Sequence, residues 1–368
     1  MVIDMYFDYT ATTPIDSEVL DTYVQVQKKY FANTTSLHLL GQKANNIYEK
    51  MKDEIRDILK VDHEVIFTSN ATEANNLAIF GVVSGKRGKV ITTKIEHPSV
   101  FNVYKELESE GYDVIYLDVD EKGIINLKQL ENEMSNDVIL VSIMWVNNII
   151  GTIEPIDKVI SIVKQYKHCK LHVDIVQGIT KIKPNFNYQD IDLLTMSAHK
   201  FYGPKGIGIL AYNKSIDLKK RLYGSSSQNG VKPGTFDLGL VVCAAKALKK
   251  YNALIDEHFT YVHELNNYLR THLTNNKIII NSDVLSSPYI LNISIPHIKG
   301  ETLVHMLESN DIYVSTGSSC SSKLVKPEKT IYAISHNEDY ALSTIRISLS
   351  FLTTKEEVDA LLKILNSL

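Results

Sequence analysis

The chain has 368 residues, a formal net charge of −4 and 44% hydrophobic residues, which is typical of a globular protein of about two domains. The slight acidity argues against non-specific binding to nucleic acid or membrane surfaces as the main activity. The three cysteines are odd in number and far apart, which excludes a disulfide framework and a cysteine-based zinc site. No apolar run could span a membrane and no signal peptide is visible, so we expect a cytoplasmic protein.

From about residue 64 the chain alternates short apolar runs with amphipathic stretches, and before them the spacing of apolar residues in 43–60 predicts a helix. Most of the apolar runs are too uniform to have a solvated face, which indicates a mainly parallel α/β sheet with helices between its strands. The predicted strands are 64–69, 89–93, 114–119, 138–144, 171–175, 193–199 and 206–212, with helices over 73–83 and 100–111.

After residue 255 the pattern changes to that of a smaller α+β domain. Its predicted elements are helices at 255–273, 301–310 and 356–368 and strands at 289–295 and 343–350. We therefore predict a large domain over 15–255 and a small domain made of 1–14 and 256–368. The small domain carries the glycine- and serine-rich segment 315–322.

Polar residues gather where predicted strands end, which is the edge at which open α/β sheets bind ligands. Ala71 and Thr72 would open a helix whose N–H groups suit a phosphate, although taken alone an ordinary helix cap by Asn70 or Thr72 is the simpler interpretation. Asp174 ends a buried strand, and Gln177 follows three residues later. A carboxylate there is either a helix cap or the partner of a buried cation.

Lys200 follows an apolar strand that ends in Ser197 and His199. An amine in this position is a Schiff-base candidate, whereas a solvated loop lysine is the simpler interpretation for any isolated lysine. Pyridoxal phosphate needs a lysine for its aldehyde, a carboxylate for its ring nitrogen and a helix start for its phosphate. Lys200, Asp174 and the predicted helix start supply this set, and His97, at the end of another strand, is a candidate to stack on the ring.

Nine motifs follow one another along the chain: YFDYTATTP, FTSNATEANN, IEHPSV, VNN-x-IG, HVDIVQ, SAHKFYGPKGIG, PGT, STGSSC and TIRISL. In these motifs and their order the chain resembles the cysteine desulfurases of the NifS/IscS type in the class-V aminotransferase superfamily. The resemblance implies the fold-type-I architecture of pyridoxal phosphate enzymes and a homodimer with composite active sites. It also implies conversion of L-cysteine to L-alanine, with the sulfur left on the enzyme as a persulfide.

The resemblance further implies a role for each motif residue. Lys200 would bind the cofactor aldehyde and then move protons, Cys320 would take the sulfur, and Arg346 would clamp the substrate carboxylate. The phosphate of the cofactor would be held by Ala71, Thr72, Ser197 and His199, and Thr235 would contact the phosphate of the partner's site. Asp174 would contact the ring nitrogen and Gln177 the ring hydroxyl. His97 would stack on the ring, and Asn148 would lie near the ring hydroxyl and the substrate.

The small, hydroxyl-rich neighbours of Cys320 would keep its thiolate accessible and let it carry sulfur. In this family a long segment between the cysteine and the arginine goes with direct delivery to acceptor proteins. Such acceptors serve tRNA thiolation, iron–sulfur cluster assembly or thio-cofactor synthesis. The chain departs from the usual pattern at Trp145, Ile149, Lys232 and Pro233, and Lys232 replaces an arginine whose bidentate contact would be lost.

Two other functions stay open: a related selenocysteine or cysteine-sulfinate lyase, and a degenerate paralogue that acts as a scaffold for sulfur transfer. A Rossmann nucleotide-binding protein is a weaker alternative, because no G-x-G-x-x-G follows the first strands and Lys200 would have no role. Cys169 and Cys243 are interpreted as structural thiols. No histidine has the spacing of a metal ligand, so we expect no metal site.

Overall fold

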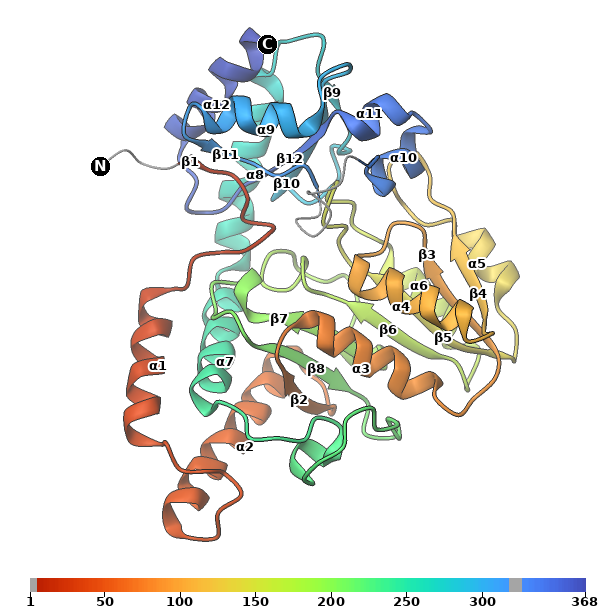
Figure 1. The fold of residues 1–368 in the computed structure, drawn as a ribbon, viewed down its shortest axis with the longest axis vertical. Helices are drawn as coiled ribbons and strands as arrows, with labels where there is room; N and C mark the ends of the chain where they lie inside the picture. Colours follow the sequence, from red (N-terminus) through yellow and green to blue (C-terminus); the bar gives the residue numbers. More distant parts are fainter. Residues whose placement is uncertain (1–4, 318–325) are drawn as a thin grey trace.

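The computed structural model describes residues 5–317 and 326–368, and a seven-stranded sheet lies at its centre (Figure 1). The order of the strands is β2-β8-β7-β6-β5-β3-β4, and only β8 runs antiparallel to its neighbours. The strands are β2 (Glu64–Thr68), β3 (Lys89–Thr93), β4 (Asp113–Leu117), β5 (Val138–Met144), β6 (Lys170–Asp174), β7 (Leu193–Ser197) and β8 (Gly208–Tyr212). The predicted mainly parallel α/β sheet is confirmed.

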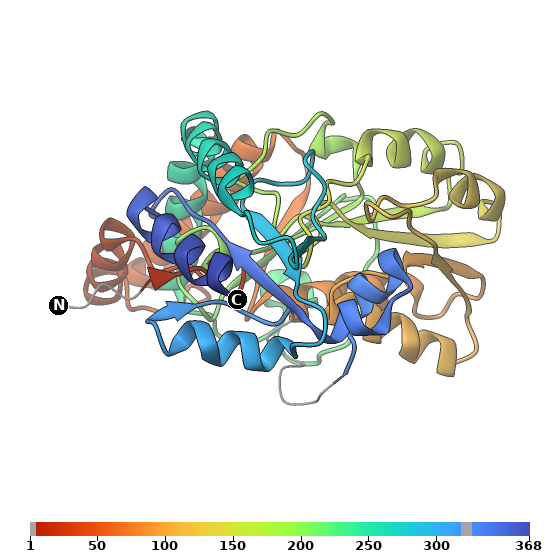
Figure 2. The same ribbon diagram turned by 90° about the horizontal axis from the view of Figure 1, so that it is seen from above.

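Helices cover both faces of this sheet, because most of its strands are apolar on both sides. In Figure 2 the orange helices of residues 71–109 lie on one side of the sheet and the teal and yellow-green helices lie on the other. On the first face are α3 (Ala71–Val83) and α4 (Pro98–Ser109). On the second are α2 (Leu39–Leu59), α6 (Ile156–Val163) and α7 (Leu238–Ala253), with α1 (Ser17–Lys29) packed on α7 and α5 (Leu127–Glu133) on α6.

The C-terminal elements, teal to blue in Figure 1, form two small sheets and a second hydrophobic core. Their strands are β9 (Ile279–Ile280), β10 (Ile290–Ser294), β11 (Ile312–Tyr313) and β12 (Thr344–Ser348), with β10 between β9 and β12. Their helices are α8 (Ile255–His272), α9 (Gly300–Glu308), α10 (Lys329–Ser335), α11 (Glu338–Leu342) and α12 (Lys355–Ser367). The N-terminal strand β1 (Met5–Tyr6) pairs with β11. The division into two domains stays a prediction.

One strand boundary differs from the prediction at a point that matters for the site. The strand predicted over 193–199 ends at Ser197, and Ala198–Lys200 form a short 3-10 turn. The turn is tight because the carbonyl of Ala198 accepts from the N–H groups of both Phe201 (3.0 Å) and Gly203 (2.9 Å). Among the residues that the structure describes, no helix is both long and apolar enough to cross a membrane.

Candidate active site

Asp174 and Ser197 are the last residues of the neighbouring parallel strands β6 and β7, so their side chains meet at one edge of the sheet. A cavity of about 210 Å³ lies at this edge. It is lined by ten of the twelve predicted site residues, namely Ala71, Thr72, His97, Asn148, Asp174, Gln177, Ser197, His199, Lys200 and Arg346. The other two are apart from it: Cys320 lies outside the described residues, and Thr235 lines a different cavity.

The N-terminal segment holds the lysine of this site. The Nζ atom of Lys200 donates to the carbonyls of Thr10 and Ala11, each at 2.7 Å. Thr13 fixes the neighbouring turn, because its N–H and its hydroxyl both donate to the carbonyl of His199. Thr10 and Ala11 also line the cavity, and sequence reasoning assigned them no role although their motif was recognised. A main-chain carbonyl has no sequence signature, so only the shared motif pointed to this segment.

Asp174 is a buried carboxylate that accepts two hydrogen bonds. Its Oδ1 accepts from the N–H of Val176 (3.0 Å) and its Oδ2 from the side-chain amide of Asn75 (2.9 Å). Burial raises the pKa of Asp174, while these two donors and the charge of Lys200 act in the opposite direction. A protonated ring nitrogen next to this carboxylate would stabilise its charged form.

His97 lies half-buried at the start of α4 and caps that helix. Its Nδ1 accepts from the N–H of Ser99 (3.2 Å) and lies 2.8 Å from the Ser99 hydroxyl. Burial, followed by the charges of Lys200, Lys329 and Arg346, lowers the pKa of His97 to about 4. The imidazole is therefore neutral at physiological pH, as a ring that stacks on a positively charged cofactor should be.

The predicted phosphate site contains one unsatisfied hydroxyl. Ser197 Oγ is buried and has no hydrogen-bond partner among the described residues. It lines the cavity together with Ala71 and Thr72 from the first turn of α3, whose start is capped by the side chain of Asn70. The simpler interpretation of an Asn70 cap is thus correct, and the helix start faces the cavity as well. An unsatisfied hydroxyl and a helix start fit a phosphate group.

Gln177 is oriented by a buried lysine that sequence reasoning missed. Lys181 Nζ donates to Gln177 Oε1 (2.9 Å), and Gln177 Nε2 donates to the carbonyl of Thr10 (3.1 Å). Burial, followed by the charges of Lys200 and Arg346, lowers the pKa of Lys181 to about 7. The amide of Gln177 therefore turns its NH₂ group toward the segment that holds Lys200.

Arg346, on β12, brings a buried cation to the cavity, with a side chain only 2% exposed. Its Nη2 pairs with Asp8 Oδ1 (2.8 Å) and its Nη1 donates to the carbonyl of Asn148 (2.9 Å). Its Nε has no hydrogen-bond partner among the described residues. A guanidinium fixed in this way presents a rigid, planar set of donors, which suits recognition of a carboxylate.

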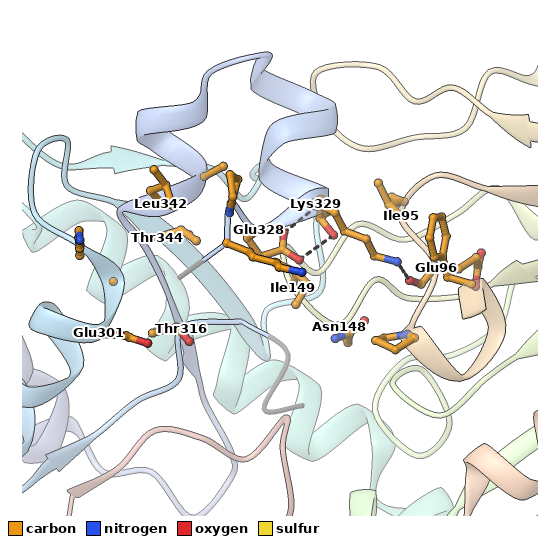
Figure 3. A pocket seen from close by; sticks show the side chains of 18 of the residues that line it. Ile95, Glu96, Asn148, Ile149, Glu301, Thr316, Glu328, Lys329, Leu342 and Thr344 are labelled. Atoms are coloured by element: carbon orange, nitrogen blue, oxygen red, sulfur yellow. Dashed lines mark hydrogen bonds between the residues drawn. The ribbon is translucent and has the colours of Figure 1, made fainter. Parts of the chain in front are cut away.

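Figure 3 shows a second cavity, of about 380 Å³. It adjoins the first, because Asn148 lines both. This second cavity is also lined by Thr316 and Lys326, which lie close to either end of the undescribed residues 318–325. At one wall Lys329 Nζ donates to the main-chain carbonyl of Glu96 and lies 3.9 Å from the centre of the Phe101 ring. Burial lowers the pKa of Lys329 to about 8.

Glu96 is fully buried beside this cavity and predicts a measurable pH dependence of stability. Burial raises its pKa to about 8 from an ordinary value of 4.5, so the folded protein keeps a proton that the unfolded chain loses. This bound proton stabilises the folded protein fully below about pH 4.5, and the stabilisation is lost as the pH rises through about 8. Glu96→Gln should therefore gain stability relative to the original protein, by a few kcal/mol, between about pH 5 and about pH 9.

Urea unfolding of both proteins across this pH range measures the effect. Glu131→Gln, at an exposed position, is the matched control and should show no such gain. If Glu96→Gln and the original protein lose or gain stability in parallel over the whole range, Glu96 is not the buried acid described here.

Three residues at which the chain departs from the motifs that it resembles make definite contacts in the structure. Lys232 pairs with Glu73 of the same chain at 2.9 Å, in the first turn of α3. Trp145 is buried against Gly178, where an added Cβ atom would lie 2.2 Å from the indole. Ile149 is buried in a small apolar cluster between the two parts of the chain. None of the three residues lines the first cavity.

The two other cysteines are buried, as predicted for structural thiols. Cys169 is 5% exposed and Cys243 is fully buried. Burial raises the pKa of each thiol to about 12. Because a thiolate is the reactive form, neither is suited to sulfur transfer.

Taken together, the described cavity fits pyridoxal phosphate in the kind of its donors: an amine, a buried carboxylate, an unsatisfied hydroxyl at a helix start and a neutral imidazole. Lys200 would hold the aldehyde, Asp174 the ring nitrogen and Ser197 the phosphate. Thr235 is not part of this cavity, and its predicted contact with the partner's site stays a prediction.

Comparisons with known proteins show the family of the chain. A "NifS/IcsS protein homolog" of Lactobacillus delbrueckii subsp. bulgaricus is 38% identical over 366 residues, which cover 96% of this chain and 94% of the homologue. "Cysteine desulfurase IscS" of Dictyoglomus turgidum is 34% identical over 369 residues, with 98% and 93% covered. A solved structure named "NifS-like protein" superposes with a TM-score of 0.92 at 34% identity and covers 98% of both chains. The family model for class-V aminotransferases matches residues 5–361, and the chain belongs to that family.

Proposed function

We propose that the protein is a pyridoxal phosphate-dependent cysteine desulfurase that converts L-cysteine to L-alanine. The observation that carries this proposal is the meeting of Lys200, Asp174 and Arg346 around one cavity, since these supply an amine, a carboxylate for a ring nitrogen and a cation for a substrate carboxylate. The relative from Dictyoglomus turgidum is named a cysteine desulfurase, which supports the proposal.

When bound, pyridoxal phosphate supplies an electron sink that weakens bonds at the amino-acid carbons. The chain's own residues do the rest. Asp174 would stabilise a proton on the ring nitrogen, His97 would cover the ring as a neutral imidazole, and Arg346 would orient the substrate through its carboxylate. Lys200 Nζ would hold the cofactor, and it would also hold and move the proton required at the substrate carbon.

The sulfur step uses Cys320, which lies outside the described residues. In the balanced reaction the C–S bond of cysteine breaks, an S–S bond to Cys320 forms, and the thiol proton ends on the carbon of the alanine product. No external oxidant or reductant is needed until the persulfide leaves. Gly317 and Lys326 flank the segment that contains Cys320, and Lys326 and the neighbouring Thr316 line the cavity that adjoins the proposed cofactor site, which supports this assignment.

A homodimer is part of this proposal. Among the described residues, six large apolar side chains between 20 and 40 are exposed, and Phe31 and Leu37 reach 74% and 91% exposure. They lie on α1, on the start of α2 and on the connection between these helices, which project away from the sheet (Figure 1). An apolar surface of this kind is typical of a protein interface. A second copy would cover it and could bring its Thr235 to this site. A sulfur-acceptor protein would receive the persulfide.

Arg346→Lys tests the role of the arginine. We expect the KM for L-cysteine to rise about tenfold or more, with a smaller change in kcat, because an ammonium cannot make a bidentate contact with a carboxylate. Arg270→Lys is the matched control. This half-buried arginine donates to the carbonyls of Ser282 and Asp283, away from both cavities. An unchanged KM in Arg346→Lys would contradict the proposed substrate contact.

Reconstitution with pyridoxal phosphate tests the proposal as a whole. The purified chain should gain the yellow absorbance of a lysine-bound cofactor and then release alanine from L-cysteine. A chain that binds no cofactor would instead favour the scaffold alternative. A chain that turns over L-selenocysteine or cysteine sulfinate but not L-cysteine would favour the related lyases.

A further inference from the structure

A continuous set of hydrogen bonds connects Asp174 with His97 through two buried side chains. One side-chain amide group, Asn75 Nδ2, lies 2.9 Å from Asp174 Oδ2 and 2.8 Å from Ser99 Oγ. Ser99 Oγ in turn lies 2.8 Å from His97 Nδ1. Asn75 is fully buried on α3 and Ser99 is 7% exposed on α4, so the path crosses from one helix to the next behind the cavity.

The direction of each bond follows from the chemistry of the groups. An ionised carboxylate only accepts hydrogen bonds, so Asp174 must face the NH₂ group of Asn75. The second N–H of that group donates to Ser99 Oγ. The hydroxyl hydrogen of Ser99 then points to His97 Nδ1, which also accepts from the Ser99 N–H at 3.2 Å. His97 therefore carries its proton on Nε2.

Asn75 is an unfavourable residue for its position if packing alone is considered. The rest of the buried face of α3 consists of Ala, Leu, Ile, Gly and Val, and the Oδ1 atom of Asn75 has no hydrogen-bond partner among the described residues. Burying an amide with one unsatisfied oxygen costs stability that a leucine of similar size would not cost. A polar residue that conflicts with its apolar surroundings in this way is expected at a functional site.

We propose that Asn75 is a positioning residue that keeps Asp174 in its carboxylate form and, through Ser99, keeps His97 in the Nε2–H tautomer. The inference rests on the proposed function for its importance, because both residues that it positions are assigned to contacts with one cofactor ring. The part of the inference that concerns the tautomer of His97 does not depend on the cofactor.

Two readouts separate these parts. The first is the ¹⁵N spectrum of the histidine rings in cofactor-free protein, in which the His97 signals are identified by their absence in His97→Asn. The second is the apparent affinity for pyridoxal phosphate. The variants are Asn75→Leu, Asn75→Asp and Ser99→Ala, and Asn76→Ala, the next residue of the same helix and outside the cavity lining, is the matched control.

In the original protein we expect His97 Nδ1 to be unprotonated. In Asn75→Leu the hydroxyl of Ser99 is free to accept a hydrogen bond, so a population with the proton on Nδ1 should appear. The affinity for pyridoxal phosphate should fall about tenfold, because a hydrogen bond to a carboxylate is lost. In Asn75→Asp the fall should be larger, since a second carboxylate next to Asp174 raises the pKa of both.

Ser99→Ala removes the hydroxyl group that connects Asn75 with His97. It should disturb the His97 ring but leave the bond between Asn75 and Asp174 in place, so the cofactor affinity should fall less than in Asn75→Leu. It also serves if the Asn75 variants do not fold. The inference is overturned if His97 has its proton on Nδ1 in the original protein, or if the Asn75 and Ser99 variants match Asn76→Ala in both readouts. If the tautomer changes as expected but the original protein binds no cofactor, the proposed function fails and the structural inference stands.

Discussion

Lys200→Arg is expected to lower the release of alanine from L-cysteine by about a thousandfold or more. A guanidinium can still donate to the carbonyls of Thr10 and Ala11, which Lys200 contacts at 2.7 Å, so the turn after β7 should keep its conformation. It cannot lose its proton at accessible pH, and it therefore cannot bind an aldehyde or move a proton as the amine would. Alanine assays and the yellow absorbance, compared with the original protein, measure the loss.

Lys205→Arg is the control for this change, because Lys205 is exposed in the same turn region. It should keep the absorbance and the activity. Alanine release by Lys200→Arg at a rate close to that of the control would mean that another amine binds the cofactor, and the assignment of Lys200 would be wrong.

Cys320→Ser is expected to lower sulfur transfer from L-cysteine about a hundredfold or more, while the cofactor absorbance is retained. A serine has the same shape, but its oxygen does not accept sulfur as a persulfide. The protein therefore keeps its cofactor and loses the step that follows. Sulfide released in the presence of a thiol reductant, together with the mass of the protein after exposure to cysteine, measures this result.

The two buried cysteines should not interfere with this experiment. Burial raises the pKa of Cys169 and Cys243 to about 12, so an alkylating reagent in native buffer should label Cys320 alone. Cys243→Ala is the matched control and should transfer sulfur normally. Full sulfur transfer by Cys320→Ser would contradict the persulfide assignment and favour a lyase that releases its product without an enzyme thiol.

Much of the cavity could be predicted from the sequence because it lies at strand ends. Buried parallel strands read as uniform apolar runs, and the first polar residue after each run marks the edge at which ligands bind. Asp174 and Ser197 are the last residues of β6 and β7, and this arrangement brings them together. The family resemblance added Arg346 and Asn148, which come from other parts of the chain and have no local pattern of their own.

The contacts that hold these residues in place could not be predicted in the same way. Lys200 is held by main-chain carbonyls of Thr10 and Ala11, about 190 residues earlier, and a carbonyl is present at every position of every sequence. Asn75 is recognisable only in retrospect, as a polar residue on the buried face of an apolar helix.

Lys232 makes a contact that the sequence did not predict, because it pairs with Glu73 on its own chain at 2.9 Å. The expected loss of an arginine's bidentate contact stays a prediction. Glu73 also accepts from the N–H and the hydroxyl of Ser69. The segment that contains Lys232 is thus tied to the first turn of α3, close to the proposed phosphate site.

The central claim is that this chain, loaded with pyridoxal phosphate, removes sulfur from L-cysteine. The most direct measurement is the amount of L-alanine and of sulfide formed from L-cysteine by the reconstituted protein with a thiol reductant. Our account predicts alanine and sulfide in equal amounts, with turnover that disappears in Lys200→Arg. A protein that shows the lysine-bound cofactor absorbance and yet forms no alanine would contradict it.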